Sequence, residues 1–193
     1  TGAKRTLGWM ANDWQVTGIW TGRTGSPYAV AYSYQSGGSS VNLTGAPDYP
    51  ARVNLIGDPG SGCSDDLYRQ FNAAAFEGPS AGSVGLESGN AYLRGCFSSV
   101  LDMSIMRRFR LGGTRSVQFR VDLFNAPNLA GITARNATMN LTNPLAPTSV
   151  TNLPFDANGE LIDARSRPRG AGFGVANGYQ SPRTIQLQLR FEF

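Results

Sequence analysis

The sequence predicts an all-β fold, a segment of an antiparallel transmembrane β-barrel, and three observations predict it. Four segments alternate between apolar and polar residues, which is the pattern of a strand with two unlike faces. Each segment is about as long as the 9–11 residues that a tilted strand needs to cross a bilayer. The connections between the segments alternate between short and long, as in barrels with short turns on one side of the membrane and long loops on the other.

The clearest alternation is in the last segment, RTIQLQLRFEF at residues 183–193. All of its apolar residues share one face and its polar residues share the other, so the segment predicts one strand with an apolar side. The apolar face contains Ile185, Leu187, Leu189, Phe191 and Phe193, and the polar face contains Thr184, Gln186, Gln188, Arg190 and Glu192.

The middle two segments, VLDMSIMRRFRL at residues 100–111 and SVQFRVDLFN at residues 116–125, follow the same rule. Their polar faces carry Arg108, Arg110, Arg120 and Asp122. The first segment, DWQVTGIWTGRTG at residues 13–25, is less regular, since Ile19 falls on the polar side.

Residues 98–111 and 115–126 are predicted to form an antiparallel hairpin. Directly opposed residues must share a face, and a three-residue loop from Gly112 to Thr114 meets that condition. This register pairs Phe109 with Val117 and Ile105 with Val121. A two-residue Gly-Gly turn would mix the two faces.

Two kinds of sheet fit the alternation. In a soluble sandwich the polar faces would be solvated, but turn signals would recur every 8–12 residues. The long connections, spanning residues 26–97 and 126–182, favour the barrel. In that fold the apolar faces contact lipid and the polar faces point into the lumen, because bilayer hydrocarbon offers no hydrogen bonds. The polar residues expected in the lumen are Arg108, Arg110, Arg120, Asp122, Gln186, Gln188 and Arg190. Gly, Asn, Ser and Thr are spread along the chain, which predicts strands joined by irregular loops.

Composition excludes several classes of protein. No apolar run approaches the roughly 18 residues of a membrane-spanning helix. The chain has no His, which excludes most catalytic triads and His-based metal sites, and no nucleophile–base pair is visible. We therefore expect no enzyme, cofactor or metal. The net charge of +4 comes from Arg residues that mostly stand singly, so we expect no nucleic-acid partner.

Cys63 and Cys96 lie in Gly/Ser-rich segments. An even count in loops predicts a disulfide in an oxidising compartment, with two free thiols as the alternative. The adjacent Asp65 and Asp66 are a weak candidate for a cation site. Sequons at Asn42, Asn136 and Asn140 carry no meaning if the protein is bacterial.

Several segments in order resemble one family of receptors. They are WQVTGIWTGRTGSPY, RVNLIGDPG, QFNAAAFEGPSAGSVG, NAYLRG, VLDMSIMRRFRL, VQFRVDLFNAPN and GFGVANGYQSPRTIQLQLRFEF. Their order and spacing resemble the Oar-like branch of the TonB-dependent receptors over most of the chain. The two cysteines are a departure that the family pattern does not explain.

The resemblance implies a bacterial outer-membrane protein with a 22-stranded barrel and an amino-terminal plug. Residues 1–193 would be the carboxyl-terminal portion of that single barrel domain, contributing its last four strands and long extracellular loops. The plug and the TonB box would lie in upstream sequence that is absent here. Arg107 is the one charge on the apolar face, and we expect it near the periplasmic end, where it can snorkel to the interface.

The family's function would be energy-coupled uptake of a nutrient. The expected partners are outer-membrane lipid, TonB acting through the missing plug, an unknown small or oligomeric substrate, and the barrel-assembly machinery. That machinery would recognise the end of the last strand, Leu189, Phe191 and Phe193, by strand addition. The alternatives are a structural or adhesive β-rich protein of the outer membrane or cell exterior without transport activity, and a secreted polymer subunit.

Overall fold

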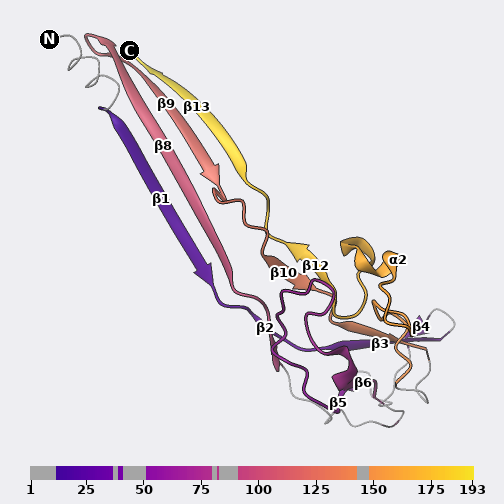
Figure 1. The fold of residues 1–193 in the computed structure, drawn as a ribbon. Helices are drawn as coiled ribbons and strands as arrows, with labels where there is room; N and C mark the ends of the chain where they lie inside the picture. Colours follow the sequence, from indigo (N-terminus) through magenta and orange to yellow (C-terminus); the bar gives the residue numbers. More distant parts are fainter. Residues whose placement is uncertain (1–11, 37–38, 41–50, 80–81, 83–90, 143–147) are drawn as a thin grey trace. The chain divides into compact units, whose positions relative to one another are not determined.

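The computed structural model describes residues 12–36, 39–40, 51–79, 82, 91–142 and 148–193 (Figure 1). The chain has two compact units. The first unit comprises Thr1–Arg23, Ser99–Ala130 and Gln180–Phe193, and the second comprises Thr24–Ser98 and Gly131–Tyr179. Within the described ranges, no helix is long and apolar enough to cross a membrane.

The first unit is a sheet of long strands, and it contains all four segments that alternate in the sequence (Figure 1). The strands are β1 (Trp14–Arg23), β8 (Ser98–Gly112), β9 (Arg115–Phe124) and β13 (Thr184–Glu192). Their order in the sheet is β1-β8-β9-β13, and β9 pairs antiparallel with both β8 and β13. The strands follow the predicted segments because period-2 patterning fixes which residues share a face.

The register of the β8–β9 hairpin is the predicted one, with Phe109 opposite Val117 and Ile105 opposite Val121. The predicted three-residue loop is wrong. Pairing continues to Gly112 opposite Arg115 after a shift in register beyond Arg110, so a bulge at that point absorbs the odd residue. Gly112 has a φ of 107° and the next residue, also glycine, a φ of 60°, a conformation that favours glycine in both places.

The second unit is built from the two long connections and contains short strands. The pairs are β2 (Pro27–Tyr28) with β7 (Leu93–Arg94), β5 (Asn54–Leu55) with β6 (Phe76–Glu77), and β10 (Ile132–Arg135) with β12 (Ala176–Tyr179). A further sheet has the order β11 (Thr138–Leu141), β3 (Ala31–Ser36) and β4 (Ser39–Ser40). The helical turns are η1 (Ala73–Ala75), α2 (Asp163–Ser166) and η2 (Pro168–Gly170).

One pair in this unit departs from the antiparallel prediction. β11 runs parallel to β3, with Thr138 opposite Ala31 and Leu141 opposite Tyr34. Parallel neighbours need a long crossover between them. Here the two strands come from different long connections, so the intervening chain supplies that crossover.

The long connections also share a hydrophobic core, which corrects the expectation of irregular loops. Its buried members are Val30, Tyr34, Ala51, Val53, Phe71, Ala75, Phe76, Leu93, Met139, Leu141 and Phe173. At its centre the rings of Phe71, Phe76 and Phe173 meet edge to face, with centroids 5.0–6.1 Å apart. Each such ring buries about 150–250 Å². The two connections therefore fold together as one structured unit.

Candidate functional site

The seven polar residues predicted for the lumen lie on one face of the sheet of long strands. The strand pairing sets them in rows across β8, β9 and β13. The rows are Arg108–Gln118–Arg190, Arg110–Ser116–Glu192, Met106–Arg120–Gln188 and Ser104–Asp122–Gln186. The structure thus brings these side chains together, while their orientation toward a lumen stays a prediction.

The charges on this polar face are compensated within the sheet. Nε of Arg120 donates to Oδ1 of Asp122 at 2.8 Å. The hydroxyl of Ser116 donates to Glu192 at 2.8 Å, and Arg108 lies 3.7 Å from the same carboxylate oxygen. Ion pairs of this kind at exposed positions contribute little stability.

A shallow hollow of about 300 Å³ lies over the part of the polar face nearest the long connections along the chain. Ile19, the residue that breaks the alternation of the first segment, is among its lining residues, which also include Gln15, Thr17, Asp102, Ser104, Met106, Arg120 and Asp122. Asp102 is held there by accepting a 2.8 Å hydrogen bond from the backbone N–H of Asn125. The hollow combines carboxylates, a guanidinium and thioether sulfur atoms.

The opposite face of the sheet is apolar and exposed. Leu187 is 69% exposed, so no second sheet of the described chain covers it. Other exposed apolar residues on this face are Trp14, Val16, Trp20, Leu111, Phe119, Ile185, Leu189, Phe191 and, just beyond β13, Phe193. Monomeric soluble proteins rarely leave so continuous an apolar surface in water. The residues that the structure describes do not form a compact sandwich, the main alternative from sequence.

Arg107 lies on this apolar face but does not extend away from it as expected of a snorkelling side chain. It is 9% exposed, and its guanidinium lies over the rings of Trp14 at 5.0 Å and Phe109 at 4.6 Å. It does occupy the part of β8 nearer the short turn, which is the end predicted to be periplasmic. The Arg107 charge is therefore stabilised by two aromatic rings, whereas we expected the membrane interface to solvate it.

The end of the last strand has the exposure that strand addition requires. Leu189 and Phe191 are exposed, Phe193 is 93% exposed, and β13 is the outermost strand of its sheet. An edge strand presents unpaired N–H and C=O groups to a partner. Recognition by the assembly machinery stays a prediction.

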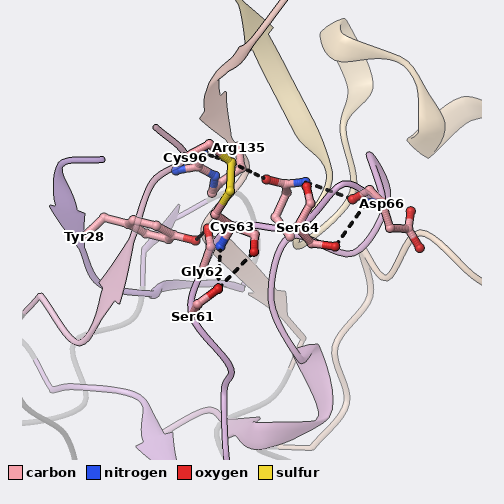
Figure 2. The surroundings of a disulfide bond; sticks show 9 residues. Tyr28, Ser61, Gly62, Cys63, Ser64, Asp66, Cys96 and Arg135 are labelled. Atoms are coloured by element: carbon pink, nitrogen blue, oxygen red, sulfur yellow. Dashed lines mark hydrogen bonds between the residues drawn. A yellow bond between two sulfur atoms is a disulfide. The ribbon is translucent and has the colours of Figure 1, made fainter. Parts of the chain in front are cut away.

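The predicted disulfide is present between Cys63 and Cys96, whose Cα atoms are 5.0 Å apart (Figure 2). Beside it the Tyr28 hydroxyl donates to the Gly62 carbonyl at 2.6 Å, and the Arg135 guanidinium lies 4.9 Å from the centre of the Tyr28 ring. Burial raises the pKa of Tyr28 to about 12, although the nearby Arg135 charge acts in the opposite direction. The disulfide lies within the first connection, and Arg135 on β10 of the second connection lies beside it, with its Nη2 3.9 Å from the Cys96 sulfur.

Gln70 is buried beside the disulfide, with its Oε1 3.6 Å from the Cys96 sulfur. Its Nε2 donates to the carbonyls of Ser64 at 2.7 Å and Asp66 at 2.8 Å. The Asp66 carboxylate accepts from the backbone N–H of Tyr68 at 2.9 Å and so caps a turn. In the part of the chain that the structure describes, no group of three or more His, Cys, Asp or Glu residues is placed to hold a metal, and Asp65 with Asp66 alone makes no such site.

The three sequon asparagines differ in their structural surroundings. The Asn136 side chain is used in two hydrogen bonds, since its amide donates to the Ala171 carbonyl at 2.7 Å and accepts from the Thr138 N–H at 3.0 Å. Asn140 is exposed on β11, and Asn42 lies outside the described residues. Sequence reasoning missed the folded second unit altogether, although the Phe and Tyr residues scattered through the long connections were a signal for a core.

A comparison with known families gives one match. The model of the family described as "Outer membrane beta barrel domain" matches residues 1–186, nearly the whole chain. No curated protein and no solved structure matches the chain.

Proposed function

Since the chain belongs to the outer membrane beta barrel domain family and is therefore an outer-membrane protein, we propose that it is part of a TonB-dependent receptor that takes up a nutrient. In this proposal the four long strands are a portion of the barrel wall. The second unit forms the loops that face the cell exterior. The plug and TonB box of the receptor would lie upstream of these residues.

The single observation that carries the proposal is the two-faced sheet. One face is apolar and exposed along its length, with Leu187 at 69%, and the other carries a charged network that includes Arg120 with Asp122 and Ser116 with Glu192. A membrane barrel with a polar interior requires this division, because hydrocarbon cannot satisfy charges. Energy coupling is supported by the family resemblance of the ordered sequence segments.

Growth of the native bacterium on single nutrients tests the proposal. Three strains are compared with the parent: one without this gene, one without TonB, and one in which the gene is restored. We expect the first two strains to lose growth on the same nutrient at limiting concentration and the third to regain it. A matched strain with the TonB box of the restored gene altered should remain deficient while placing the protein in the outer membrane.

A structural or adhesive role is the second candidate, and the folded second unit with its own hydrophobic core favours it. Under that role, deleting the gene would leave uptake of every nutrient unchanged and alter surface attachment or envelope integrity. Uptake that persists without TonB but fails without this gene would contradict the energy-coupled mechanism.

A further inference from the structure

The second unit contains a pocket of about 420 Å³ beside its aromatic core. Phe71, Phe76 and Phe173 form its floor as part of the edge-to-face cluster, while the better exposed Ile56 and Leu153 lie at its margin. Sites for small molecules are commonly of about 300–1,000 Å³ and lined mainly by apolar and aromatic side chains with a few polar groups. The pocket has the size and lining of a ligand site.

A cation already rests on an aromatic ring at this pocket. The guanidinium carbon of Arg69 lies 4.2 Å from the centre of the Phe155 ring, and both residues line the pocket. Aromatic rings attract cations through the negative potential of their faces, and the attraction grows when water is excluded. The Phe155 ring is therefore taken by Arg69, which adds one positive charge to the lining.

The carboxylates of the lining indicate the charge of a ligand that would fit the pocket. Asp156 and Glu77 contribute two carboxylates against the single positive charge of Arg69. Asp156 is occupied by its own turn, where Oδ1 accepts from the N–H groups of Asn158 at 2.9 Å and Glu160 at 2.8 Å. Glu77 forms no ion pair or side-chain hydrogen bond with any residue in the described ranges. It is the carboxylate available to a ligand.

We propose that this pocket binds a small molecule that has an apolar ring and a cationic amino group. The ring lies against Phe71, Phe76 and Phe173, and the amino group pairs with Glu77. A charge-assisted hydrogen bond at such a half-buried carboxylate supplies orientation as well as affinity. This site goes beyond the proposed uptake function and does not rest on it.

Three probes with one indole ring and different charges test the proposal. The complete outer-membrane protein in lipid nanodiscs is titrated calorimetrically with tryptamine, tryptophol and indole-3-propionate, and empty nanodiscs give the background. We expect saturable binding of tryptamine, about tenfold tighter than tryptophol, since a hydrogen bond to a charged group accounts for that ratio or more. Indole-3-propionate should bind most weakly.

Matched variants locate the site. Glu77→Gln should abolish the preference for tryptamine over tryptophol, whereas Arg69→Gln, which removes the like charge, should keep it. Ala74 is exposed and lines the pocket, so Ala74→Trp should fill it and remove binding of all three probes. Formation of the Cys63–Cys96 disulfide, assayed by thiol alkylation, checks that each variant has folded.

The proposal is overturned if no probe binds saturably, if tryptophol binds as tightly as tryptamine, or if indole-3-propionate binds best. It is equally overturned if Glu77→Gln keeps the tryptamine preference while Ala74→Trp removes binding. None of these results bears on uptake, which is measured separately in cells.

Discussion

An arginine placed at position 187 should distinguish the lipid-facing side of the sheet from its polar side. Leu187 lies near the middle of β13, opposite Val121 on β9, and is 69% exposed within the chain. If water covered this face, Leu187→Arg would cost almost nothing, because the new charge would be solvated. If lipid covers it, the charge lies near the bilayer midplane, where an arginine costs about 2–4 kcal/mol of folding free energy.

The matched control is Gln188→Arg, one residue along the same strand and on the other face. Its new charge would lie opposite Arg120, whose guanidinium is held 2.8 Å from the Asp122 carboxylate. Like charges directly opposite each other on neighbouring strands cost about 0.2–1 kcal/mol. The expected difference between the two variants is therefore at least about 1 kcal/mol, with Leu187→Arg the less stable.

The measurement is reversible folding of the complete barrel into phospholipid vesicles as a function of urea or guanidinium. Tryptophan fluorescence follows the transition, and heat-modifiable migration in gels confirms the folded fraction. Equal costs for the two substitutions, or a larger cost for Gln188→Arg, would refute the assignment of the Leu187 face to lipid.

Three further predictions concern the second unit and the end of the chain. Replacing Cys63 and Cys96 by Ser should destabilise the second unit by about 3–4 kcal/mol in the chain-entropy description of a cross-link of this length, seen as faster proteolysis in the long connections, and unchanged proteolysis would contradict it. Because the pKa of Tyr28 is raised from 10.0 to about 12 by burial, the folded unit keeps this proton where the unfolded chain loses it. Stability should therefore be fully present below about pH 10 and fall as pH rises toward 12, and Tyr28→Phe should reduce that slope in pH-dependent unfolding. Deleting Phe193 should lower the amount of assembled protein in the outer membrane without changing the stability of barrels that do fold, and unaltered levels by heat-modifiability would exclude its role as an assembly signal.

The sheet of long strands could be predicted from sequence because each strand has two unlike faces. A shift by one residue would bury Arg120 among apolar groups and expose Val121 on the polar side, so patterning alone specifies the register. The bulge near Gly112 could not be predicted in the same way. A two-residue loop keeps the faces consistent only because the bulge beyond Arg110 absorbs the extra residue, and that bulge is set by local backbone geometry.

The second unit escaped prediction because its order comes from contacts between distant segments. Phe71 and Phe173 are in contact but lie far apart in the sequence, so no local pattern links them. β3 and β11 are strands of only a few residues. Strands this short contain too few residues for an apolar–polar alternation to be recognised. The cysteines were the exception, since their residue type alone implied a cross-link.

The shared core has a consequence for the order of events during biogenesis. Cys63 and Cys96 both belong to the connection before β8, so their bond can close as soon as that stretch reaches an oxidising compartment. Phe173 and the strand β11 arrive only after the β8–β9 hairpin has been made. Closing contacts over so long a stretch of chain is slow, because the entropy of the loop is lost before the contacts form. The early disulfide would therefore hold the first connection in a compact form. Phe173 and β11 would then complete the hydrophobic core when they are made.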